Sequence, residues 1–311
     1  MGLPRRAHPL RLGKCGLAAR ARAPRHTARG KPILPIQPTH PLLTLNATPL
    51  GLGRTCPAPP QPDVNSHFGI MDLMGFDKDR TWWYRSWFPT VNEPVTTSTV
   101  LHAFPHWNWN AGDKVDIWSY SNAAAVELFV NGVSQGKKTM PQFSHVEWDQ
   151  VPFAAGSYYA VAYDSNGVAV ATTAVNTTGA PVALRASIRD GYGEQLYTGC
   201  FDFGLVMVEV VDSQGLVVPY ANNSVTVSVA GTASSWVEGT GNGDPAGHEN
   251  NKSPTHAAFH GLMLGVIGGG NDVGTITVTA SSPGLTPSSV QMPVSDGSNL
   301  RTKWCHNLPQ L

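Results

Sequence analysis

The sequence lacks a long hydrophobic run, a regular cysteine pattern and any acidic residue near its N-terminus. A membrane span needs about 20 consecutive apolar residues, and no window reaches that length, so we expect no membrane insertion. Pro and Arg interrupt every apolar run before residue 62, which argues against a secretory signal. The cysteines show neither metal-ligand spacing nor a redox pair, and we expect no disulfide framework. They are Cys15, Cys56, Cys200 and Cys305.

Residues 1–62 contain ten Lys or Arg but no Asp, Glu or Ser, which leaves 11 of the 21 basic and all 21 acidic side chains for residues 63–311. Prolines are frequent in this segment and apolar periodicity is missing. Such a chain cannot bury enough apolar surface to offset its conformational entropy, so we expect a disordered leader. A transit peptide or a basic arm for nucleic acid are alternatives. Of these three interpretations we prefer a non-homologous leader, and we expect no nucleic-acid partner.

Helical periodicity is nearly absent after residue 99, where short strands alternate with turn sequences. Val126–Val130 is followed by Asn131-Gly132, a pair that readily adopts the positive φ angles of a two-residue hairpin. A second hairpin is expected around Asp164–Gly167. Regular short strands with frequent turns indicate antiparallel β-sandwiches.

The fold class is therefore predicted to be mainly β, with two consecutive immunoglobulin-like sandwiches. Residues 66–76 read as a short buried strand and turn, and residues 77–87 as an amphipathic helix. This isolated βα unit is expected to be a remnant of a larger domain. The expected divisions are a leader at 1–62, the remnant at 63–90, sandwiches at 99–176 and 181–287, and a tail at 288–311.

Three consecutive stretches resemble the glycoside hydrolase family 2 β-galactosidases. Phe68–Trp87 is similar to the last strand and helix of that family's (β/α)₈ barrel. The stretch from His106-Trp107-Asn108-Trp109 to Gly136-Lys137-Lys138 is similar to the sandwich that follows the barrel. Leu184–Leu285 is similar to a further C-terminal sandwich, through motifs such as Gly241-Asn242-Gly243-Asp244-Pro245. The resemblance thus identifies the C-terminal portion of such a protein.

The resemblance implies retaining hydrolysis of terminal β-galactosides. That reaction uses two carboxylates roughly 5 Å apart, carried at the C-terminal ends of barrel strands, and a barrel occupies roughly 250 residues. The first sandwich begins near residue 99, which leaves no room for those strands. We therefore expect a non-catalytic fragment, from a truncated product or an incomplete gene model. A subunit that completes a barrel on another chain, and a stand-alone carbohydrate-binding or structural module, are the alternatives.

Two acidic residues are candidates for a site. Glu93 follows Asn92, as in the family's acid/base motif, but it lies in a Pro-rich connector without a preceding buried strand, so we reject it and expect no catalytic residue. Asp72 would end the last barrel strand, where it either contacts the sugar or caps the following turn. Asp72-Leu73-Met74 replaces the Asn-x-Lys clamp of the family's β-glucuronidases, and a uronic acid would require a cation. A galactosidase-like parent is favoured.

Tryptophan and histidine clusters suggest two further kinds of site. Seven of the nine tryptophans lie between Trp82 and Trp148, and we expect them to serve the core or an interface rather than a carbohydrate platform. Three histidines, His248, His256 and His260, could ligate a metal by residue type, but their surroundings read as loops. No metal and no cofactor are expected.

Overall fold

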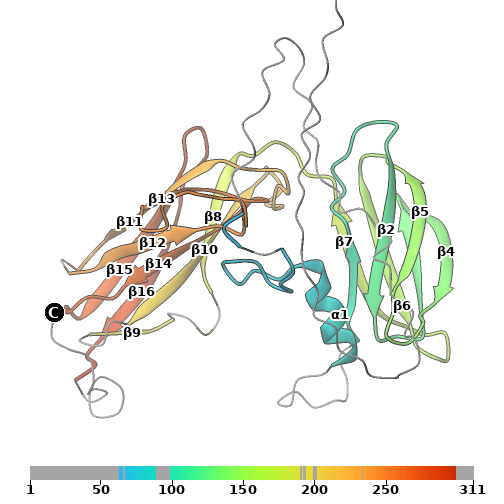
Figure 1. The fold of residues 1–311 in the computed structure, drawn as a ribbon, viewed down its shortest axis with the longest axis horizontal. Helices are drawn as coiled ribbons and strands as arrows, with labels where there is room; N and C mark the ends of the chain where they lie inside the picture. The colour runs from blue at the N-terminus through green and yellow to red at the C-terminus, as the bar shows by residue number, and fades with distance from the viewer. Residues whose placement is uncertain are drawn as a thin grey trace, which may run out of the picture. The chain divides into compact units, whose positions relative to one another are not determined.

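The computed structural model describes residues 63–65, 67–88, 99–189, 191, 194–198, 202–232 and 234–298. Within them the chain forms one helix and 16 strands, arranged in four sheets (Figure 1). The predicted leader, Glu93 and all four cysteines lie outside the described residues. Among the described residues no helix is long and apolar enough to cross a bilayer.

The first sandwich consists of a three-stranded and a four-stranded antiparallel sheet, ordered β1-β2-β5 and β4-β3-β6-β7. Alternate residues of the central strands β3 and β6 face the core, as expected for sheets with one covered face. In β3 the inward residues are Val126, Leu128 and Val130. The strands are β1 Leu101–Phe104, β2 Lys114–Ser121, β3 Ala125–Val130, β4 Val133–Thr139, β5 Val146–Pro152, β6 Ser157–Tyr163 and β7 Ala169–Asn176.

Both hairpins predicted in this sandwich are confirmed. Asn131 and Gly132 connect β3 to β4 with φ angles of 47° and 83°, the left-handed conformations that a two-residue turn requires. In the β6–β7 connection the Asp164 carboxylate accepts hydrogen bonds from the backbone N–H groups of Asn166 and Val168, at 2.9 and 2.8 Å. Local turn chemistry therefore fixes the register of these strand pairs.

Trp107 lies at the centre of the first core and is fully buried. Its indole N–H donates to the carbonyl of Ala154 at 2.9 Å, and its ring packs edge-on against Phe153 and Tyr158. Trp148 is also buried, and its indole N–H donates to a backbone carbonyl. The prediction that the tryptophans serve packing is confirmed for these two residues.

The second sandwich packs a four-stranded sheet, β12-β14-β10-β8, against a five-stranded sheet, β13-β11-β15-β16-β9. Its core includes the fully buried Val206, Val208, Ile267 and Ile276. The mainly β fold with consecutive sandwiches is thus confirmed. The strands are β8 Ala183–Ile188, β9 Leu196–Tyr197, β10 Phe203–Val211, β11 Ser224–Ala230, β12 Trp236–Gly241, β13 Thr255–Ala257, β14 Leu262–Gly268, β15 Gly274–Ser281 and β16 Ser288–Ser295.

The second sandwich extends beyond its predicted end at residue 287. Strand β16 pairs antiparallel with β15 and parallel with β9, and it buries Met292 and Val294. The placement of residues 288–295 in a polar tail was therefore wrong. Serine and glutamine separate the few apolar residues of β16, so its sequence resembles that of a polar tail although the inner face of the strand is apolar.

The region before the first sandwich contains helix α1, Asp79–Trp87, close to the predicted position. The predicted buried strand before it is wrong. Among the described residues of this segment, the only β-pairing is an isolated bridge between Met71 and Asp77, and Phe68 is 93% exposed. A single strand cannot satisfy its backbone or bury its side chains without a neighbouring strand.

The connection between the sandwiches is fixed at the buried carboxylate of Asp212. It accepts hydrogen bonds from the backbone N–H groups of Gly179, Gln214 and Leu216, at 2.8, 2.9 and 2.9 Å. These bonds hold the pKa of Asp212 below its usual value, and the bond from Gly179 lowers it most. The ionised carboxylate therefore ties the linker to the turn that follows β10.

Replacing Met292 by Ala should lower the free energy of unfolding by about 2–5 kcal/mol, because a fully buried side chain leaves a cavity. Gln291→Ala, on the exposed face of the same strand, is the matched control and should change it by less than about 0.5 kcal/mol. Urea unfolding followed by tryptophan fluorescence measures both. Equal, small effects would contradict the assignment of β16 to the core.

Asp212 should make the stability of the second sandwich depend on pH. Because its pKa is lowered by folding, its contribution is complete above the unfolded value of about 4 and is lost as the pH falls through the folded pKa. Asp212→Asn should lower the free energy of unfolding at pH 7 and flatten its decline in acid. Urea unfolding at pH 7, 5, 4 and 3 tests this, and an unchanged pH slope would refute it.

Candidate functional site at the Asp72 turn

Asp72 caps a tight turn that precedes helix α1. Its Oδ1 accepts hydrogen bonds from the backbone N–H groups of Met74 and Phe76, both at 2.9 Å, and its own N–H donates to the Phe76 carbonyl. Gly75 occupies the left-handed region with φ of 74°. Asp is suited to this position because its short carboxylate can bond to backbone groups just ahead of it. Turn capping, one of the two roles predicted for Asp72, is therefore observed.

The side chain of Asp72 also lines a hollow of about 250 Å³. One side of the hollow comes from the segment around Asp72 and the other from the loop that follows β12. Carboxylate, ammonium, amide and backbone groups all face it, a composition suited to a polar ligand. The other lining residues are Asn65, Gly69, Met71, Leu73, Lys78, Gly243 and Pro245.

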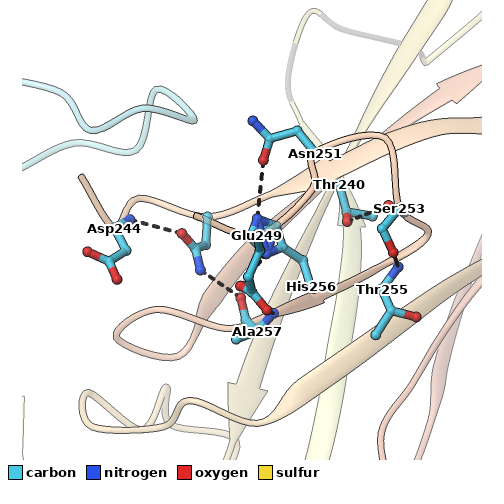
Figure 2. A network of polar contacts seen from close by, with 9 residues as sticks. Thr240, Asp244, Glu249, Asn251, Ser253, Thr255, His256 and Ala257 are labelled. Carbon is cyan, nitrogen blue, oxygen red and sulfur yellow. Dashed lines mark hydrogen bonds and ion pairs between the residues drawn. The ribbon is translucent and has the colours of Figure 1, made fainter. Parts of the chain in front are cut away.

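A second hollow of about 230 Å³ lies between Leu73 and Met74 and the loop that joins β12 to β13. That loop is fixed by internal polar contacts (Figure 2). Asn242 donates to the carbonyl of Ala257 at 2.9 Å and accepts from the N–H of Asp244 at 3.0 Å. The loop is thereby held as a firm wall for both hollows.

His256 lies in β13, directly after this loop, and is buried, with 3% exposure. Its Nδ1 lies 2.5 Å from a carboxylate oxygen of Glu249, and its Nε2 lies 3.3 Å from Oδ1 of Asn251 (Figure 2). Glu249 also accepts a hydrogen bond from the backbone N–H of Ala257. His260 is bonded elsewhere, to the Pro219 carbonyl. Within the described ranges no cluster of three or more metal-ligating side chains occurs.

Arg189, which the sequence did not single out, binds the backbone carbonyl groups of the Asp72 turn. Its guanidinium donates to the carbonyl oxygens of Met74, at 2.7 Å, and of Gly75, and it lies 5.7 Å from the Phe76 ring centroid. A separation of 115 residues between Met74 and Arg189 leaves no local pattern that could have revealed the contact.

Helix α1 is attached to the first sandwich. Asp79 lies 2.8 Å from Nε2 of His102, and the His102 ring stacks on Trp82 with a centroid distance of 5.1 Å. Trp87 contacts Phe143. These contacts agree with the expected role of the helix tryptophans at an interface.

The structure therefore defines the class of the protein as a tandem β-sandwich region, in which a short turn–helix segment contacts both sandwiches. Comparison with known families then identifies the family of each sandwich. Residues 193–291 match the glycoside hydrolase family 2 C-terminal domain 5, and residues 112–171 match a domain of unknown function, DUF4982. The chain belongs to glycoside hydrolase family 2 and corresponds to the C-terminal portion of its members, as the sequence motifs predicted.

Similar proteins are much longer than the matched region. Beta-galactosidase BoGH2A of Bacteroides ovatus is 40% identical over 230 residues, which cover 72% of this chain and 25% of that protein. A beta-glucuronidase of Formosa agariphila is 30% identical over 215 residues, covering 68% and 21%. The chain thus spans about a quarter or less of the length of these relatives.

Solved structures of similar proteins share the fold. A beta-glycosidase from Bacteroides vulgatus superposes with a TM-score of 0.64 at 25% identity, over 73% of this chain and 28% of that one. A glycosyl hydrolase family 2 member from Bacteroides cellulosilyticus gives 0.64 at 27% identity, over 73% and 32%. The arrangement of strands is therefore that of a family 2 C-terminal region.

Glu249→Ala should destabilise the loop, because it leaves the buried His256 without its carboxylate partner. We expect the free energy of unfolding to fall by about 1–3 kcal/mol, the cost of an unsatisfied buried polar group. Glu147→Ala is the matched control, since its 3.5 Å contact with His145 is partly exposed and should contribute less than about 1 kcal/mol. Thermal and urea unfolding measure both; equal losses would contradict a structural role for the buried pair.

Proposed function

We propose that this chain is the C-terminal part of a β-galactosidase-like enzyme of glycoside hydrolase family 2. Residues 63–88 would contribute to the end of a barrel, and the two sandwiches would support it. The 40% identity to a protein named beta-galactosidase supports this proposal. The same relative extends far beyond the matched 25% of its length, which leaves room for a catalytic domain.

Hydrolysis itself would be carried out by residues outside those described. Retaining glycosidases need two carboxylates roughly 5 Å apart, one as general acid/base and one as nucleophile. The described residues form two sandwiches and a single helix, and barrel enzymes place their catalytic groups at the ends of barrel strands. We therefore expect the isolated chain to have no glycosidase activity.

Asp72 is the residue of this chain that we assign to the substrate side of the pocket. The observation that carries this assignment is the hollow of about 250 Å³, which Asp72 lines together with Gly243 and Pro245. Carboxylate oxygens accept hydrogen bonds from sugar hydroxyls, and a negative charge disfavours the carboxylate of a uronic acid. Lys78 is the cation that lines the hollow, and its ammonium donates to the carbonyl of His67. A neutral galactoside fits this balance better than a glucuronide.

A full-length chimaera tests the proposal. Residues 63–298 replace the matching region of the Bacteroides ovatus relative, and hydrolysis of p-nitrophenyl β-galactoside and β-glucuronide is compared with that of the isolated chain. We expect galactoside turnover by the chimaera alone. In the chimaera, Asp72→Asn should raise KM for galactoside about tenfold, because a charged hydrogen bond contributes about 1.5–3 kcal/mol, while the amide oxygen still caps the turn.

Asp72→Ala is the structural comparison, because it removes the cap as well as the charge and should lower thermal stability. An unchanged KM with Asp72→Asn would overturn the assignment of Asp72 to the substrate. Hydrolysis by the isolated chain that is abolished by Glu93→Gln would overturn the proposed absence of catalysis. Glycan binding by the isolated chain without activity in the chimaera would favour a carbohydrate-binding module instead.

A further inference from the structure

Arg189 is itself rigidly held by the second sandwich. It directly follows β8, and its backbone N–H donates to the carbonyl of Leu205 in β10 at 2.9 Å. Its planar guanidinium then reaches two consecutive carbonyl groups of the Asp72 turn at once. This fork geometry is specific to arginine, because the lysine ammonium is a single point charge on a flexible stem. The position of the turn is thereby coupled to the strands of the second sandwich.

The opposite side of the turn is limited by two glycines. A Cβ atom on Gly241 would lie 2.6 Å from the Met74 sulfur, and one on Gly243 would lie 1.9 Å from Oδ2 of Asp72. Gly243 is not among the residues with positive φ, so its role is close approach rather than an unusual backbone conformation. The loop also accepts a hydrogen bond from the Val64 N–H at the Pro245 carbonyl, at 2.8 Å.

We propose that the second sandwich positions the Asp72 carboxylate through a clamp made of Arg189, Gly241 and Gly243, and so sets the substrate affinity of the pocket. Arg189 fixes the carbonyl side of the turn, and Gly243 fixes the carboxylate at van der Waals distance. Asp72 has little freedom between them, since its Oδ1 is bonded within the turn. The part of the inference that concerns substrate rests on the proposed function; the clamp rests on geometry alone. Arg189 and the glycines are positioning residues and do not act on the reaction directly.

The clamp is tested first in the full chain, by hydrogen–deuterium exchange of the peptide that spans residues 72–76. Arg189→Lys removes the fork, and Gly243→Ala inserts a methyl group against Asp72. Each should accelerate exchange of the Met74 and Phe76 amides at least fivefold and leave β10 unchanged. Arg185→Lys is the matched control, because Arg185 lies on β8 and pairs with Glu209, away from the turn.

The effect on substrate is tested in the full-length chimaera with the same three variants. Arg189→Lys and Gly243→Ala should raise KM for the galactoside three- to tenfold with kcat within twofold, the pattern of lost ground-state binding. Arg185→Lys should leave both constants unchanged. Loss of stability alone would lower the active fraction, and hence kcat, without raising KM.

The outcomes separate the two proposals. If Asp72→Asn raises KM but Arg189→Lys and Gly243→Ala do not, the effect of the clamp on substrate affinity is refuted and the proposed function stands. If KM is unchanged in Asp72→Asn, Arg189→Lys and Gly243→Ala alike, the substrate role of Asp72 is refuted. The inference about affinity is then refuted as well. Exchange in Arg189→Lys that equals exchange in Arg185→Lys refutes the clamp whatever the kinetics show.

Discussion

Face-to-face packing of two sheets is the constraint on which each sandwich depends. Side chains at alternate positions, such as Val206 and Val208 in β10 or Ile276 in β15, are removed from water between the sheets. Burial of such side chains stabilises by about 1.5–3 kcal/mol each, and the hydrogen-bonded ladders keep the strands in register. Because the cores supply the stability, the loops at the strand ends are free to carry chemistry.

The loop between β12 and β13 is one of these strand-end loops, and polar contacts hold it in place. Asn242 bonds to the Ala257 carbonyl and to the Asp244 N–H, and Glu249 contacts His256 and the Ala257 N–H (Figure 2). These polar contacts tie the loop to β13. Two glycines, Gly241 at the end of β12 and Gly243 in the loop, allow Met74 and Asp72 to approach closely. The same motif that identified the family, Gly241-Asn242-Gly243, thus has a steric purpose.

The segment from residue 63 to 88 differs from the two sandwiches in how it is stabilised. It has no core, and it is held by Arg189 on one side and by contacts of Asp79 and Trp82 with His102 on the other. Phe68, Tyr84 and Phe88 are exposed, and the indole nitrogen of Trp87 is buried without a hydrogen-bond partner among the described residues. This incomplete packing agrees with the proposal that the segment belongs to the end of a larger domain.

The sequence by itself determined the family, the two β-sandwiches and two hairpins of the first sandwich. These features follow from local properties, namely alternating side chains and the positive φ of Asn131-Gly132, or from motifs along one stretch of chain. It misplaced β16 and predicted a strand before α1, because both depend on whether a neighbouring strand exists. Only the tertiary structure decided the surroundings of Asp72, since Arg189 and Gly243 reach it from more than a hundred residues away. Contacts over such separations are set by how the sheets pack, and no local pattern encodes them.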